Sequence, residues 1–121
     1  MAALTEKGAA SLALALGLWG CVAADDGGAA ERGRRLMAHY QCTACHRVPG
    51  VPGPQGSFGP SLEGFGLRIY IAGQWPNDAQ HVAAWIVAPS AWVPDTPMPA
   101  LGVAPADARD IAAFLTRLET Q

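Results

Sequence analysis

Two cysteines and a histidine stand close together in the segment Cys42-Thr43-Ala44-Cys45-His46. Two thiols separated by two residues can add across the two vinyl groups of a porphyrin, and the adjacent imidazole then binds the iron from the same side. The residue types and their spacing therefore predict one covalently attached haem c. Cys42 and Cys45 would hold the porphyrin, and His46 would be an iron ligand.

Three other kinds of site use a spaced cysteine pair, and the surrounding sequence fits each of them less well. A thioredoxin-like redox pair needs a strand before it, and the residues before Cys42 have no strand pattern. A structural zinc site needs four ligands, yet after Cys21 the chain has no second Cys/His pair. A disulfide between Cys42 and Cys45 would close a very short loop and stabilise the protein little.

A haem held in this way needs a second iron ligand from the other side of the porphyrin, and the candidates are Met37, His39, His81 and Met98. Met37 and His39 lie too close to Cys42 on the preceding segment, and His81 is expected at the surface. Met98 stands between two prolines, whose rings stiffen its loop. We therefore predict His46 and Met98 as the two iron ligands, an arrangement that leaves no open position for a substrate.

The first part of the chain is expected to be a signal peptide over residues 1–21. The apolar run from Leu12 to Trp19 is too short to span a bilayer, which takes about 20 residues, but it suits a signal-peptide core. The residues ending at Cys21 resemble a lipobox, in which that cysteine is lipidated and anchors the protein to the membrane. Cleavage after Ala24, or an uncleaved anchor, is the alternative. Each version predicts a periplasmic or other extracytoplasmic protein.

The remaining chain fits one domain, expected over residues 30–121 after a flexible, Gly-rich tether over residues 22–29. The full sequence has 121 residues and a formal net charge of −2, which argues against nucleic acid as a partner because that would need a basic patch. Lys7 is the only lysine.

The periodicity predicts an all-α fold of about four helices with long loops. The first helix is expected over about residues 30–41, with Gly33 on its apolar stripe, where another helix could cross closely. A Gly- and Pro-rich loop follows over residues 48–60. A short helix is expected over residues 67–72, and another over residues 78–87 with Asn77 as its N-cap.

The end of the chain is expected to form a loop and a final helix. Residues 90–103 contain Pro94, Pro97 and Pro99 and predict an irregular loop. Pro105 is placed to open the last helix at its first position, with Asp107 in the first turn. The apolar face of this helix would comprise Ile111, Phe114, Leu115 and Leu118.

From about Gly33 to Leu118 the sequence resembles the class I cytochromes c. The likeness rests on the Cys42–His46 motif, on Gly59-Pro60 with Leu62 and Gly64, and on the Trp85 to Met98 segment. It implies the class I fold wrapped around one haem. It also implies that the Pro60 carbonyl accepts the imidazole hydrogen of His46 and that Arg68 lies near a haem propionate. Trp85 would lie close to Met98, and Phe114 would pack near Gly33.

The sequence also departs from the family. Asp95 stands where a glycine is usual, and the stretch from Arg68 to Trp85 is short, so a loop that covers a propionate is missing. Trp75 and Asn77 would either replace the donors of that loop or serve only in a turn. The run from Ala72 to Gly102 looks more like the cytochrome domains attached to bacterial haem-copper oxidases.

The resemblance implies a carrier of single electrons and not an enzyme. Its partners would be redox proteins such as a respiratory complex or a terminal oxidase. Because the chain lacks lysines after Lys7, docking is expected to depend little on long-range electrostatic steering. Two alternatives remain open: a haem-bearing structural subunit of a respiratory complex, and a catalytic or gas-binding cytochrome in which Met98 is displaced.

Overall fold

The computed structural model describes residues 26–119. It contains four α-helices, α1 (Asp26–His39), α2 (Ala79–Val87), α3 (Pro89–Trp92) and α4 (Pro105–Leu115). Two short 3-10 helices, Cys42–Ala44 and Phe65–Leu67, and one antiparallel pair of two-residue strands, β1 (Tyr70–Ile71) and β2 (Trp75–Pro76), complete it. The mostly helical fold with long loops is confirmed.

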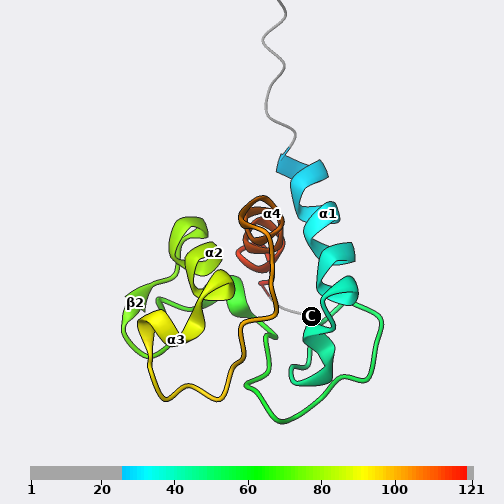
Figure 1. Ribbon diagram of the computed structural model, residues 1–121. Helices are drawn as coiled ribbons and strands as arrows, with labels where there is room; N and C mark the ends of the chain where they lie inside the picture. The colour runs from blue at the N-terminus through cyan, green and yellow to red at the C-terminus, as the bar shows by residue number, and fades with distance from the viewer. Residues whose placement is uncertain (1–25, 120–121) are drawn as a thin grey trace, which may run out of the picture.

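Helices α1 and α4 pack closely against each other, as Figure 1 shows. A side chain at Gly33 would overlap the Asp110 carbonyl group, and its Cβ would lie 2.9 Å from the Ile111 Cα. The Tyr40 hydroxyl, just after α1, donates a 2.6 Å hydrogen bond to the Asp107 carboxylate in the first turn of α4. The close helix crossing predicted at Gly33 is therefore confirmed.

The core is formed where α2 joins this helix pair. Its most buried side chains include Met37, which is 2% exposed, together with Val82 and Ile111. Val48, Leu62 and Phe65 come from the connecting loops and extend the same cluster. Met37 is thus a core residue, which agrees with setting it aside as an iron ligand.

Helix α1 begins earlier than predicted. It starts at Asp26, so residues 26–29 of the expected tether are helical. Ala29 and Ala30 favour helix, and Ala30 is buried, so packing extends the helix by a further turn. The expected signal peptide over residues 1–21, with Cys21, lies outside the described residues.

The helix predicted over residues 67–72 is wrong. The chain instead makes the 3-10 turn Phe65–Leu67 and then the β1–β2 pair, in which Ile71 is opposite Trp75. Ala72 and Gly73 both have positive φ, 47° and 82°, and Gln74 N–H donates to the Ile71 carbonyl at 3.1 Å. Such a turn reverses the chain and ends any helix.

Two further boundaries differ from the predictions. Asp78, not Asn77, caps α2, and its carboxylate accepts the His81 backbone N–H at 2.8 Å. Residues 89–92 form the short helix α3, which overlaps the start of the loop expected over residues 90–103. Pro89 occupies the first helical position, where its missing N–H costs nothing.

The last helix follows its prediction more closely. Pro105 stands at the start of α4 with Asp107 in the first turn. The helix ends at Leu115, so Leu118 reaches the core from a turn beyond it. No helix within residues 26–119 is long and apolar enough to span a membrane.

The Gly33 contact predicts the effect of Gly33→Ala. Overpacking a tight core contact costs about 1–3 kcal/mol, and the atoms facing Gly33 are backbone atoms that cannot rotate away. We expect a loss near the upper end of that range, although alanine itself favours helix over glycine by about 1 kcal/mol. Urea unfolding of the holoprotein measures the change. Gly27→Ala, on the exposed start of the same helix, is the control, and an equal effect of both variants would contradict the prediction.

The Tyr40–Asp107 hydrogen bond predicts a dependence of stability on alkaline pH. Donation to the Asp107 carboxylate raises the pKa of Tyr40 above its ordinary value, which is about 10. Because the folded pKa is the higher one, the bond stabilises the fold below about pH 10 and this contribution is lost as pH rises through the raised pKa. Tyr40→Phe should therefore be less stable than wild type at pH 8, with the gap narrowing at higher pH. A gap that stays constant in urea unfolding across this range would contradict the prediction.

Candidate functional site

The cysteine motif begins where α1 stops. Gln41 adopts a left-handed conformation, with φ 59°, and turns the chain into the 3-10 helix Cys42–Ala44. The His46 backbone N–H donates to the Cys42 carbonyl at 3.0 Å, which keeps the motif compact. Cys42 and Cys45 are half-buried free thiols. Burial raises the pKa of the Cys42 thiol to about 11, as expected for a sulfur in apolar surroundings.

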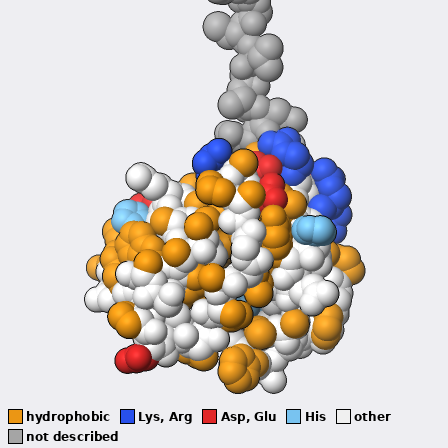
Figure 2. Space-filling view, viewed as in Figure 1, with side chains coloured by type: hydrophobic (Ala, Val, Ile, Leu, Met, Phe, Trp, Pro, Cys, Tyr) orange, Lys and Arg blue, Asp and Glu red, His pale blue; other side chains and the backbone are white. Residues whose placement is uncertain are grey.

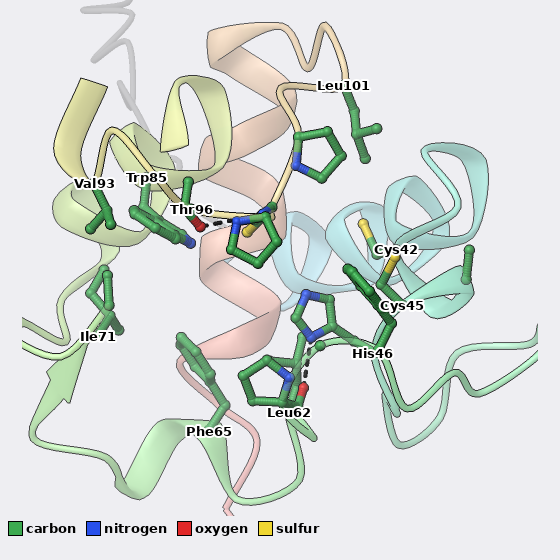
Figure 3. Close-up of a pocket in the computed structure, with 18 of the residues that line it drawn as sticks. Cys42, Cys45, His46, Leu62, Phe65, Ile71, Trp85, Val93, Thr96 and Leu101 are labelled. Atoms are coloured by element: carbon green, nitrogen blue, oxygen red, sulfur yellow. Dashed lines mark hydrogen bonds between the residues drawn. The ribbon is translucent and has the colours of Figure 1, made fainter. Parts of the chain in front are cut away.

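A cavity of about 750 Å³ opens beside this motif and is mostly apolar. Its wall combines the motif with the 58–62 loop, the β1 region, Trp85 of α2 and the 93–101 loop. Figure 3 shows Cys42, Cys45 and His46 on one side of the space and Trp85 and Thr96 on the other. A volume of this order accommodates a cofactor-sized ligand.

The His46 ring is fixed by the loop that follows the motif. Its Nδ1 lies 2.6 Å from the Pro60 carbonyl oxygen, the contact that the family resemblance implies. A Cβ at Gly59 would lie 2.5 Å from the ring Cε1, so glycine is needed for the loop to approach this closely. With Nδ1 donating to a carbonyl, Nε2 remains the nitrogen able to bind a metal.

Met98 also lines the cavity, on the 93–101 loop. The Thr96 hydroxyl accepts the Met98 backbone N–H at 3.3 Å, and the Thr96 N–H donates to the Val93 carbonyl at 3.0 Å. These local bonds hold the Met98 segment in one turn. Asp95, which replaces the usual glycine, is exposed at the cavity wall.

The structure brings Arg68 and Trp85 to the same cavity. One Arg68 guanidinium nitrogen donates to the Ser61 carbonyl, and the group lies 5.1 Å from the centre of the Phe65 ring. Arg68 is thereby held at the cavity wall by contacts with two neighbouring segments. Among the described residues that line the cavity, Arg68 and Asp95 carry the formal charges.

Trp75 is not brought to the cavity. Its ring packs edge-on against Trp92, with centres 5.0 Å apart. The Asn77 side-chain amide donates hydrogen bonds to the carbonyls of Phe65 and Arg68, at 2.8 and 3.0 Å. Both residues therefore serve the hairpin and its neighbouring turn, which was the simpler of the two roles expected for them.

The other candidate iron ligands lie elsewhere. His39 is exposed at the end of α1. The His81 ring nitrogen Nδ1 lies 2.7 Å from the Asp78 carboxylate, and the ring packs against Trp92. The backbone and side-chain N–H groups of His81 lower the pKa of Asp78. Neither histidine lines the cavity.

Three residues that line the cavity were not predicted from the sequence. Phe58, Tyr70 and Leu101 line the space yet are 76%, 60% and 46% exposed. Apolar residues isolated in Gly- and Pro-rich loops are the signal that would have pointed to them. On the face shown in Figure 2, the visible basic side chains gather toward the end where α1 begins, while the lower part is largely apolar or uncharged apart from an acidic group at its edge.

The chemistry of this site suits a porphyrin better than a metal ion alone. No group of three or more His, Cys, Asp or Glu side chains able to hold a metal occurs within residues 26–119. Two thiols, one oriented imidazole and one thioether instead surround an apolar space. The Gly59 backbone lies so close to the His46 ring that a side chain there would overlap the ring, so the loop holds the imidazole in one orientation. The residues present therefore fit a haem.

Comparisons with known proteins agree with this fit. A sequence profile of the Cytochrome c family matches residues 30–119. The chain is 31% identical over 91 residues to cytochrome c oxidase subunit 2 of Alkalihalophilus pseudofirmus, an alignment that covers 74% of this chain and 26% of the relative. The chain therefore spans about a quarter of the length of the curated relative it matches. No solved structure matches significantly.

The profile covers most of the chain, including both thiols, the histidine and the whole cavity wall. The spacing of the thiols is the one that attaches haem in this family. The chain accordingly belongs to the cytochrome c family, binds haem c covalently through Cys42 and Cys45, and functions in haem-based electron transfer.

Proposed function

We propose that this protein is a carrier of single electrons, not an enzyme, with His46 and Met98 as the two iron ligands. The main support for this proposal is that His46 and Met98 line the same cavity from separate loops. The Pro60 carbonyl orients the His46 ring. When bound, haem supplies an iron that changes between the ferrous and ferric states. Two protein ligands leave no position for a substrate.

The residues around the ligands have distinct roles in this proposal. The Pro60 carbonyl makes the imidazole a stronger electron donor by sharing its Nδ1 proton. Trp85 and the apolar wall would exclude water from a bound haem, and Arg68, which also lines the cavity, would supply a positive charge for its acidic propionate groups. Trp75 supports the hairpin through Trp92 and is not proposed to touch the haem.

The proposed partner is a component of a respiratory chain, with a terminal oxidase favoured. Support comes from the relative named as a cytochrome c oxidase subunit. We further propose an extracytoplasmic location, with lipidation of Cys21 as the membrane anchor. An anchor would raise the local concentration of the carrier at the membrane surface, where such partners lie.

The docking surface proposed here is the apolar rim of the cavity. Phe58 and Leu101 are exposed there, and charged side chains are scarce among the lining residues. Apolar contacts act only at short range, whereas charge steers partners from a distance. Association should therefore depend on shape and burial at the rim.

Replacing the proposed thioether ligand tests the function directly. Met98→Ala should abolish the weak far-red band of Met–Fe(III) ligation and lower the reduction potential, so that ascorbate no longer reduces the haem easily. Reduced-minus-oxidised visible spectra of the purified holoprotein measure both effects. Met37→Leu, a change in the core, should leave the spectrum unchanged. If wild-type protein lacks the band and binds carbon monoxide, Met98 is not a firm ligand and the electron-carrier proposal fails.

The apolar rim predicts a weak effect of salt. The second-order rate of electron transfer to a purified terminal oxidase should change less than about threefold between roughly 20 and 200 mM salt, because little charge steers the encounter. Phe58→Ser should slow this reaction about fivefold, equivalent to about 1 kcal/mol at an interface. Leu67→Ser is the matched control, since Leu67 is exposed but outside the cavity lining. A steep decline with salt would contradict docking through the rim.

A further inference from the structure

The segment between Arg47 and Leu62 is a loop whose two ends meet. The Leu62 N–H donates to the Arg47 carbonyl at 2.9 Å. Between these ends the chain contacts the cysteine motif twice, through Gly56 N–H to the Thr43 carbonyl at 2.8 Å and Gly59 N–H to the Cys45 carbonyl at 2.7 Å. The loop thus lies along the motif, and its Pro60 carbonyl then contacts the His46 ring.

The middle of this loop is organised by one side chain, that of Gln55. Its Oε1 accepts the Val48 backbone N–H at 2.7 Å, and its Nε2 donates to the Val51 carbonyl at 2.7 Å. The side-chain amide therefore takes the place of a backbone partner for both valines. Because Val48 and Val51 are buried, unpaired backbone groups there would be costly.

The backbone of Gln55 is itself in an unfavourable conformation. Its φ is +54°, in the left-handed region that residues with a side chain rarely adopt. A non-glycine residue keeps this conformation only when surrounding contacts offset its energetic cost. At Gln55 the two side-chain hydrogen bonds provide that stabilisation. The next residue, Gly56, makes the first contact with the motif, so the geometry at Gln55 sets the direction of the chain toward Gly59 and Pro60.

The Arg34 side chain supports the same loop from outside. Its Nη1 donates to the Gly50 carbonyl at 3.1 Å, while Nε and Nη2 bind the Glu31 carboxylate at 2.9 and 2.8 Å. This contact fixes the outer part of the loop on α1. Within the described part of the chain, the Arg34 side chain makes no hydrogen bond to residues 56–60. The Gln55 side chain instead connects the part of the loop near Val48 and Val51 to the residues that follow it, from Gly56 to Pro60.

We propose that Gln55 is a positioning residue for the haem ligand: through its two hydrogen bonds it holds the Pro60 carbonyl against His46 and thereby adjusts the reduction potential. This inference rests on the proposed function, in which His46 binds the iron. Loosening the loop weakens the Nδ1 hydrogen bond, which makes the imidazole a poorer electron donor. A poorer donor stabilises the oxidised iron less, so the potential rises.

Two variants of the holoprotein separate the hydrogen bonds from the strained backbone. Gln55→Met keeps the length of the side chain and the left-handed strain but cannot make the two hydrogen bonds. Gln55→Gly also loses the bonds yet removes the strain. The control is Gln80→Met on the exposed face of α2.

The measurements are the reduction potential and the exchange rate of the His46 Nδ1 proton, followed by NMR in the reduced state. Both Gln55 variants should shift the ratio of reduced to oxidised protein at a fixed ambient potential upward at least threefold, and the Nδ1 proton should exchange at least tenfold faster. Gln55→Gly should unfold at higher urea than Gln55→Met, with the same direction of potential shift. Gln80→Met should match wild type in both measurements.

Several results would overturn the inference. If both Gln55 variants lose stability but keep the wild-type potential and exchange rate, Gln55 only supports the fold. A faster exchange without a change in potential would equally remove the link to the iron. Failure of the proposed function is recognised separately: the far-red band would be missing from wild-type protein itself, whereas this inference is tested with the band present in wild type and both variants.

Discussion

The constraint on which this structure depends is the need to enclose a cavity of about 750 Å³ within a small helical domain. Domains of this size bury little apolar surface, so an unfilled space of that volume would be severely destabilising. A smaller space of about 70 Å³ is lined both by core residues such as Met37 and Ile111 and by His46 and Met98. Core and haem site are therefore continuous, and the covalently bound haem c completes the core.

Helices supply the frame of this enclosure, and loops supply most of its chemistry. The α1–α4 crossing at Gly33 and the Tyr40–Asp107 hydrogen bond place the start of the motif. The 47–62 loop places the Pro60 carbonyl beside the His46 ring. The 93–101 loop carries Met98, whose backbone N–H donates to the Thr96 hydroxyl. Trp85 of α2 and the β1 strand also line the cavity, but His46, Pro60 and Met98 all lie outside helices and strands, so their positions depend on short contacts in irregular chain.

How far the sequence predicted this arrangement depended on whether the signal was local. Two signals were local, because each is contained in a few consecutive residues: the spacing of Cys42, Cys45 and His46, and the prolines on either side of Met98. Both could be recognised from the sequence. The helix predicted over residues 67–72 was wrong because the turn at Ala72 and Gly73 pairs β1 with β2. The sequence left two roles open for Trp75, and the choice between them depended on Trp92 of α3, a helix that no periodic pattern indicated. Tertiary contacts of this kind have no signature in the chain between them.

The scarcity of charge at the cavity links the two halves of the proposed function. Oxidised haem iron carries one more positive charge than reduced iron, and apolar, water-poor surroundings disfavour that charge. In the proposed function, the apolar wall that would raise the reduction potential includes the residues that reach the surface at Phe58 and Leu101. Exposed apolar side chains at the mouth of a cofactor site are costly for solubility, yet they allow close contact with a partner without desolvating charges. Arg68 is the one arginine or lysine among the described residues of this wall, and its contacts with the Ser61 carbonyl and the Phe65 ring hold its side chain in place there.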